Sequence, residues 1–178
     1  LSTMTADVAL KGDSESLELT YPMGNNPLLW DEFHPNLYEL KISLTSKGGI
    51  KDERNIRFGL RDFSTRDTQF TINGNLTFLR GTLEWAIFPR TGYPATDEKE
   101  WTRIFEICRS YGLNHLRFHS WTPPEAAFNV ADRLGFYLQI ECSSWANQGA
   151  TIGDGNALDQ YIYEESNRVV DVFGNHPS

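Results

Sequence analysis

Residues 114–128 read NHLRFHSWTPPEAAF and place charged and aromatic side chains where an apolar strand pattern meets a helix start. Arg117, His119 and Trp121 stand at this junction, and Glu141 closes the next apolar run. A guanidinium pairs with carboxylates, an imidazole exchanges hydrogen bonds, and an indole offers a flat aromatic face. These side chains are therefore the chain's first candidates for a binding site.

Each candidate also has a purely structural interpretation. Arg117 could form an ordinary ion pair, with Glu141 as its partner, while His119 and Trp121 could pack beneath a loop. His115 and His119 are four residues apart, which suggests a metal site. On a strand, however, that spacing leaves the two rings on one face but well separated. We therefore expect no metal site, and nothing in the sequence calls for a cofactor.

An alternation of strand-like and helix-like segments positions these residues. Asp97 with Glu100 predicts a capping box at the start of a helix that Gly112 ends. A second capping box, Thr122 to Glu125, predicts another helix, which Gly135 ends. The remaining expected elements are strands at 77–82, 113–118 and 136–141 and a helix at about 158–173.

This alternation implies a parallel sheet with right-handed crossovers, either half of a doubly wound sheet or the opening of an eight-stranded barrel. No glycine-rich phosphate loop follows any strand, which weakens the nucleotide-binding interpretation. In a barrel, chemistry occurs at the carboxyl ends of the strands. That end would carry the candidates already named, and the flanking loops add four weaker ones: Glu84, Trp85, Trp145 and Asn147.

The first third of the chain has the period-two pattern of half-buried strands. Residues 17–21, 37–44 and 56–63 alternate in this way, and turn formers separate them. They predict an incomplete β-sandwich. Asn73-Gly74 between two β-prone runs predicts a hairpin, because both turn residues need positive φ.

Composition narrows the class of protein. The 178 residues carry a formal net charge of −8, which argues against a nucleic-acid partner and weakly against an anionic membrane surface. Two cysteines are too few for a disulfide framework, and no apolar run is long enough to span a bilayer. The first residues lack the basic start and apolar block of a signal peptide. We expect the chain to be a piece of a longer protein.

Several blocks of the sequence, in order, resemble glycoside hydrolase family 2, which includes β-galactosidases, β-glucuronidases and β-mannosidases. Residues 112–141 are similar to the family's first signature, and LLWDEFHPNLYEL is similar to a block of its immunoglobulin-like sandwich. RFGLRDF and FTINGNLTFLRG are similar to the link from that sandwich into a barrel. The positions that match the first signature are Asn114, Arg117, Pro123, Asp132, Gly135 and Phe136–Leu138.

The resemblance implies a partial immunoglobulin-like β-sandwich over residues 1–66. It implies the first three βα units of a (β/α)8 TIM barrel over residues 67–178. Arg117 would lie near the family's nucleophile and help hold that carboxylate ionised. The other substrate-binding candidates are His119, Trp121, Glu141, Trp145 and Asn147, with Trp121 able to stack on a sugar ring.

The last four residues, Asn175 to Ser178, match the start of the family's second signature, whose Asn-Glu ending carries the general acid/base. The nucleophile is a Glu on the seventh strand. The resemblance therefore implies that neither catalytic residue lies in this chain, and that a Glu84–Glu141 pair is not the catalytic one. The sequence reads FHSWTPP where the family usually has Ser-His-Tyr-Pro, and no counterpart of a metal-binding Glu and His is evident. Neither the sugar nor a magnesium requirement is carried over.

We thus expect part of a retaining glycosidase that acts on oligo- or polysaccharides, inactive as an isolated chain. The alternative is a non-catalytic carbohydrate-binding or structural module. Exposed edges of the incomplete barrel and sandwich favour oligomerisation. The compartment is not readable from these residues; a periplasmic or secreted whole protein is expected only because relatives that degrade polysaccharides are often exported.

Overall fold

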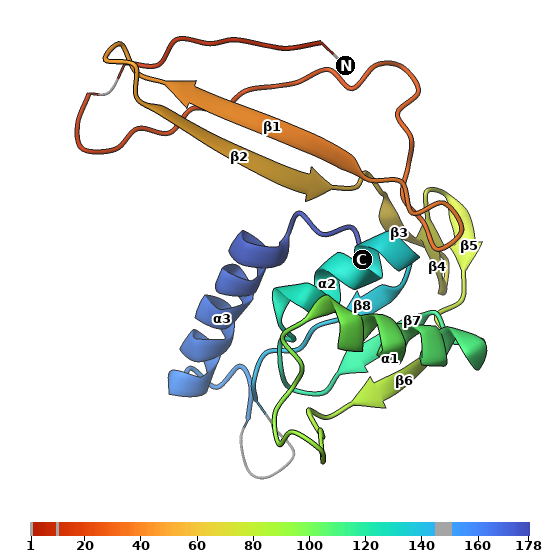
Figure 1. The fold of residues 1–178 in the computed structure, drawn as a ribbon. Helices are drawn as coiled ribbons and strands as arrows, with labels where there is room; N and C mark the ends of the chain where they lie inside the picture. The colour runs from red at the N-terminus through yellow and green to blue at the C-terminus, as the bar shows by residue number, and fades with distance from the viewer. Residues whose placement is uncertain (1, 10, 145–150) are drawn as a thin grey trace.

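The computed structural model describes residues 2–9, 11–144 and 151–178 (Figure 1). Its strands are β1 (Tyr38–Thr45), β2 (Lys51–Phe58), β3 (Phe63–Arg66), β4 (Gln69–Ile72), β5 (Asn75–Thr77), β6 (Gly81–Glu84), β7 (His115–Phe118) and β8 (Tyr137–Gln139). Its helices are α1 (Glu98–Ser110), α2 (Glu125–Leu134) and α3 (Ala157–Phe173). A projecting β-ribbon, a small meander and a parallel sheet with helices follow one another along the chain (Figure 1).

The projecting ribbon is a two-stranded antiparallel sheet of β1 and β2. Strand β1 confirms the prediction at 37–44. The predicted strand at 56–63 is wrong: β2 ends at Phe58, and β3 begins at Phe63. The chain leaves the sheet between them because the Leu60 carbonyl accepts a hydrogen bond from the Trp30 amide at 2.7 Å, and Gly59 packs against Trp30 and Pro177.

The predicted sandwich is not confirmed. Residues 17–21 form no strand, and among the described residues β1 and β2 pair only with each other. Both strands are almost wholly exposed, so their alternating apolar side chains find no opposing sheet within the described ranges. The sequence pattern predicted half-buried strands, but the described residues form no second layer that would bury them.

The meander β3–β4–β5 confirms the predicted hairpin. Asn73 and Gly74 form its turn with φ values of 52° and 76°. Asn73 also joins the hairpin to the rest of the molecule, because its side-chain amide donates to the Trp30 carbonyl at 3.0 Å and its side-chain oxygen accepts from the Asp62 amide at 2.9 Å. The turn is thus fixed both by local conformation and by two distant backbone segments.

The second half of the chain forms the expected parallel sheet in the order β6–β7–β8, with α1 and α2 against one face (Figure 1). The first strand is Gly81–Glu84 rather than 77–82, because residues 75–77 belong to the meander. The third is shorter than 136–141. The core between sheet and helices consists of Trp101, Phe105, Leu116, Phe118, Ala127, Val130, Ala131 and Phe136.

Of the two predicted helix caps, the structure forms the one at Asp97 but not the one at Thr122. Asp97 Oδ1 accepts from the Glu100 amide at 3.0 Å and caps α1, although the Glu100 side chain turns to Arg103 instead of reaching back. The Thr122 box is wrong. Pro124 takes the N-cap position with extended ψ, so α2 begins at Glu125, beyond the reach of Thr122. Thr122 Oγ1 is buried without a hydrogen-bond partner among the described residues.

The amino end of the parallel sheet is closed by residues from the β-rich part. Trp30 is fully buried beside Ile72 and Tyr137, with its ring edge-on to Tyr137 at 5.6 Å between centroids. The two halves of the chain therefore share a small core at the amino end of the parallel sheet.

Candidate functional site

The carboxyl ends of β6, β7 and β8 meet at one edge of the sheet because the strands are parallel and in register, with Leu83 opposite Arg117 and Arg117 opposite Gln139. Leu116 and Phe118 alternate into the helix-covered core. Arg117, one position out of phase, therefore stands on the helix-free face. This is the geometry that the sequence predicted for a site.

Arg117 and Glu141 form the centre of the candidate site. The Arg117 Nε donates to Glu141 Oε1. The second carboxylate oxygen, Oε2, accepts from the Ser120 amide at 2.9 Å and lies 3.3 Å from His119 Nδ1. Burial raises the pKa of Glu141, but the hydrogen bonds from Arg117, Ser120 and His119 outweigh it, so that the pKa lies below its ordinary value. Glu141 is held as a carboxylate.

Glu84 ties the loops after β6 and β7 together. Its backbone carbonyl accepts from the His119 amide at 2.9 Å and from Trp121 Nε1 at 3.3 Å. Its own carboxylate accepts from the Ala86 amide at 2.8 Å and so folds back into its loop. Burial raises the pKa of Glu84, and these hydrogen bonds offset only part of that rise. The two carboxyl groups at this edge thus sit in opposite electrostatic environments.

The aromatic candidates divide into an exposed one and a packed one. Trp85 is 57% exposed, and its ring meets His119 edge-on at 6.4 Å. Trp121 is half-buried and packs against Phe118 at 5.2 Å and against Trp101. The structural interpretation therefore describes Trp121 well, whereas Trp85, a weaker candidate from sequence, presents the more accessible aromatic face.

Two predicted site residues, Trp145 and Asn147, lie outside the described residues. Within the described ranges, no three His, Cys, Asp or Glu side chains are grouped so that they could hold a metal ion. His115 is the first residue of β7 and lies opposite Gly81, whose missing side chain makes room for the imidazole. Sequence reasoning missed Ser120: its φ of 60° turns its amide towards Glu141, and no residue type in the sequence signals that contact.

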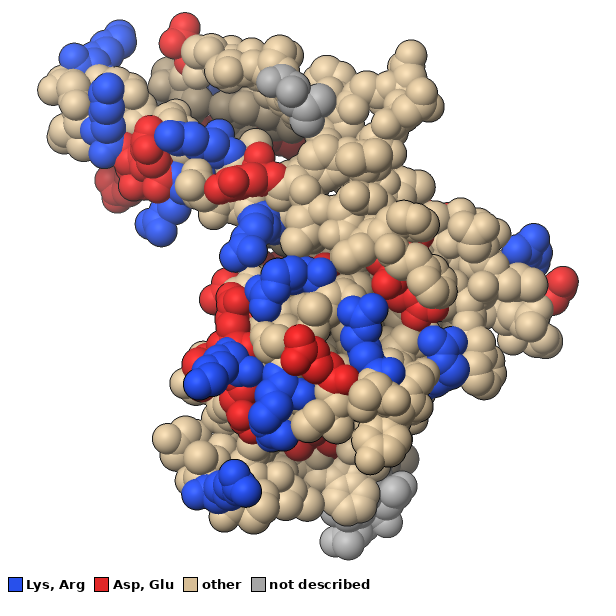
Figure 2. All heavy atoms as spheres, turned by 45° about the vertical axis from the view of Figure 1, so that its right-hand side comes forward, with Lys and Arg blue, Asp and Glu red and all other residues tan. Residues whose placement is uncertain are grey.

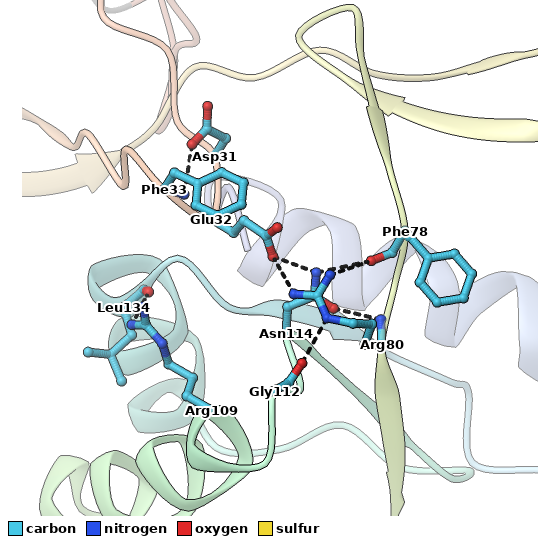
Figure 3. A network of polar contacts seen from close by, with 9 residues as sticks. All are labelled: Asp31, Glu32, Phe33, Phe78, Arg80, Arg109, Gly112, Asn114 and Leu134. Carbon is cyan, nitrogen blue, oxygen red and sulfur yellow. Dashed lines mark hydrogen bonds and ion pairs between the residues drawn. The ribbon is translucent and has the colours of Figure 1, made fainter.

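A second polar network lies at the opposite, amino end of the sheet (Figure 3). The Asn114 side chain accepts from the Arg80 amide at 2.7 Å and donates to Glu32 Oε2 at 2.5 Å. Arg80 also donates to the Gly112 carbonyl at 2.8 Å and lies near Glu32. These bonds fix the starts of β6 and β7 to residues that precede the meander. Asn114 is therefore a structural residue in this chain.

The surface shows no division into basic and acidic faces in the view of Figure 2, where Lys and Arg side chains are interspersed with Asp and Glu. On the face seen in that view, the described residues form no basic stripe of the kind that binds nucleic acid. Among the described helices, none combines the length and the apolar character needed to cross a bilayer.

Comparisons with known proteins agree with one another. Residues 5–61 match the sequence model of the glycosyl hydrolases family 2. A putative beta-glucuronidase of Formosa agariphila is 30% identical over 157 residues, which are 86% of this chain and 18% of the relative. A beta-galactosidase of Leuconostoc mesenteroides is 28% identical, over 92% of this chain and 16% of its own length.

Solved structures give the same picture. A glycosyl hydrolase family 2 member from Bacteroides cellulosilyticus superposes with a TM-score of 0.69 at 27% identity, over 85% of this chain and 20% of that one. A GH2 beta-galacturonidase from Eisenbergiella tayi, at 18% identity, shows the fold alone, with a TM-score of 0.73 over 91% of this chain. The chain thus spans about a fifth, or less, of the length of the first relatives that it matches.

Proposed function

Because the chain belongs to glycosyl hydrolase family 2, we propose that the whole protein hydrolyses O-glycosidic bonds of oligo- or polysaccharides by the retaining route. The relatives that support this are a putative beta-glucuronidase and beta-galactosidases. The substrate is a carbohydrate. The sugar itself is left open, because these relatives differ in whether their sugar carries a carboxylate.

The described residues supply one wall of the sugar pocket. The observation that carries this proposal is the cluster of Arg117, Glu141, His119 and Ser120 at the carboxyl end of the parallel sheet. Strand ends of this kind carry the chemistry of parallel β/α folds. A fixed guanidinium and an imidazole, with the exposed face of Trp85 beside them, match the hydroxyl groups and the apolar face of a sugar ring.

The domain assignment remains as the sequence predicts it: residues 1–66 belong to an accessory sandwich and residues 67–178 to a barrel. The family match over 5–61 supports a boundary near this point. The parallel order β6–β7–β8 supports the barrel. Trp30 lies in the first part and packs against Tyr137 at the amino end of the sheet, so the two parts share a core.

In this proposal the catalytic carboxyl pair belongs to parts of the protein other than these 178 residues. Retaining hydrolysis needs one carboxylate to attack and one carboxyl group to donate a proton, at a separation of about 5–5.5 Å. The Glu141 carboxylate is ion-paired with Arg117, and the Glu84 carboxylate is turned into its own loop. Neither is poised to attack a substrate. The 178-residue chain alone is therefore inactive.

The test is glycosidase activity of the whole protein on nitrophenyl glycosides of neutral sugars and of uronic acids. We expect turnover with retention of the anomeric configuration, seen in the first-formed product by NMR. Arg117→Met should lower kcat/KM by at least about 100-fold, because a misplaced active-site carboxylate costs that much. Arg103→Met, an exposed arginine on α1, serves as the control.

If the whole protein turned over none of these glycosides and the isolated chain bound oligosaccharides, the protein would be a carbohydrate-binding module and not a glycosidase. Turnover by the isolated 178-residue chain would instead contradict the proposed location of the catalytic pair. Either result would also contradict a role for Arg117 beside the nucleophile, because that role requires a catalytic carboxylate from another part of the protein.

A further inference from the structure

Asp132 of α2 is a buried carboxylate that does not face the candidate sugar site. It is 3% exposed. Its Oδ2 lies 2.6 Å from His176 Nδ1, and its Oδ1 accepts from the Ser178 backbone amide at 3.0 Å. Both carboxylate oxygens are thus satisfied by donors from the same three-residue segment, 176–178. A buried carboxylate with two charge-assisted bonds to one segment fixes that segment's position closely.

The β-rich part of the chain contacts both α2 and the same segment, 176–178. Trp30 Nε1 donates to the Asp132 backbone carbonyl at 2.8 Å. Arg61 Nε donates to the Pro177 carbonyl. A Cβ on Gly59 would lie only 2.5 Å from Pro177 Cγ, so glycine is needed there to admit the proline. Residues 176–178 are therefore held between Asp132 of α2 and residues 59–61, and Trp30 ties α2 itself to the β-rich part.

These contacts determine how the segment meets the sheet. The Leu138 amide donates to the Ser178 carbonyl at 2.8 Å, whereas the neighbouring Tyr137 amide donates to Asn114, at the start of β7. Successive amides of a strand point to opposite sides. Ser178 therefore occupies the place of a fourth strand, on the edge of β8 away from β7.

We propose that Asp132 is a positioning residue that sets the register of the fourth strand position against β8. Because side chains alternate along a strand, a slip of one residue would turn every following side chain to the other face of the sheet. The inference rests on the proposed function, since the strand aligned by Asp132 would bring its carboxyl end beside Arg117 and Glu141. Asp132 touches no sugar and acts only through this alignment.

The first test uses the 178-residue chain and does not depend on activity. Asp132→Asn keeps the shape of the side chain but removes its charge and one acceptor. We expect the β8 peptide that contains Leu138 to exchange its amide hydrogen at least about tenfold faster in mass spectrometry, with β7 peptides unchanged. His176→Gln, which leaves the Trp30 bond in place, should show the same local effect if Asp132→Asn fails to fold. Asp171→Asn, on the exposed face of α3, is the control.

The second test uses the whole protein. Asp132→Asn should lower kcat per active site by at least about tenfold with KM within about twofold, because a shifted strand misplaces reacting groups and leaves the sugar wall intact. Loss of folded protein with an unchanged kcat per active site would overturn the proposal, as would unchanged exchange at Leu138. A whole protein without glycosidase activity would overturn the proposed function, and the exchange result would then decide the register inference alone.

Discussion

Glu84 ends β6 and Glu141 follows β8 on the far side of β7, yet their pKa values move in opposite directions. Glu141 receives a guanidinium and a backbone amide, which outweigh its burial. Glu84 receives only neutral donors, chiefly from its own loop, and burial raises its pKa. The same residue type therefore has two roles: one carboxylate is an ionised anchor for Arg117, and the other organises its own loop although burial opposes its charge.

Glu84→Gln should stabilise the chain at pH 7. The amide oxygen can still accept from Ala86, and the cost of burying a charge disappears. Because Glu84 is only partly buried, solvent screens that cost, and we expect a gain of roughly 0.5 kcal/mol, or about 1–2 °C in Tm. A folded-state pKa above the unfolded value of about 4.3 means that the gain is absent below pH ~4 and appears as pH rises through the folded pKa. Thermal melts across pH 3–8 measure this profile.

Glu141→Gln, the matched substitution, should have the opposite sign. It leaves the Arg117 guanidinium without its carboxylate and costs about 0.5–1 kcal/mol at pH 7. The pKa of Glu141 is depressed on folding, so its stabilisation is complete above the unfolded value of about 4.3 and is lost as pH falls through the folded pKa. The two variants should therefore converge on the wild-type Tm in acid. Equal signs at pH 7 would contradict the assigned environments.

At the scale of the elements, two helices end in glycines that look equivalent in sequence. Gly112 follows α1 with φ 77°, and Gly135 follows α2 with φ 70°. A Cβ on Gly112 would meet no atom within 4 Å, whereas one on Gly135 would lie 2.7 Å from the Glu32 backbone oxygen. Gly135 therefore does two things: it ends a helix, and it lets the segment around Glu32 approach the sheet.

Gly112→Ala should cost only the strain of a left-handed residue, about 1 kcal/mol. Gly135→Ala adds the displacement of a backbone segment that carries Trp30 and Glu32, and we expect a total loss of about 2–4 kcal/mol. Urea unfolding of both variants measures the difference. Equal losses would show that residues 30–32 yield without cost, against the close packing of Glu32 on Gly135.

The elements show which parts of the fold could be read from sequence. The Asn73-Gly74 turn and the Asp97 cap were predicted correctly because each depends on conformations within four residues. The end of β2 and the start of α2 were not. Gly59 and Leu60 leave the ribbon to contact Trp30, a long-range partner, and Pro124 displaces Thr122 as the cap.

The candidate site divides in the same way. Residue types at the strand ends pointed to Arg117 and to its pairing with Glu141, which the structure forms. They could not indicate the Ser120 amide, which acts through backbone geometry alone. Nor could they place Asp132 on His176, because that contact joins residues 44 positions apart. The residue types of the site could be read from the sequence. The contacts that orient them, from Ser120 and Asp132, depend on the tertiary fold.

At the scale of the whole molecule, the chain exposes far more surface than its mass requires. Its accessible area is 12914 Å², whereas a monomeric protein of 20.3 kDa exposes about 8,800 Å². The excess includes large apolar side chains: Phe78 is 78% exposed, and Leu76 and Phe70 line a groove beside it on the meander. Edges of β1, β2 and β6 are also open within the described residues. Such surfaces are normally covered by protein.

The isolated chain should therefore self-associate, because burying its apolar surface against a second copy gains about 25 cal/mol for every Å² removed from water. Sedimentation velocity between roughly 2 and 200 µM should show a weight-average mass that rises with concentration. Leu76→Ser with Phe78→Ser should reduce that rise, while Thr45→Ser, at the end of β1 and outside the groove lining, should not. A 20.3 kDa species at every concentration, with a sharp and concentration-independent melt, would contradict the prediction. Such a result would mean that the β-ribbon and the open sheet are stable without a cover, as would be expected of an independent module.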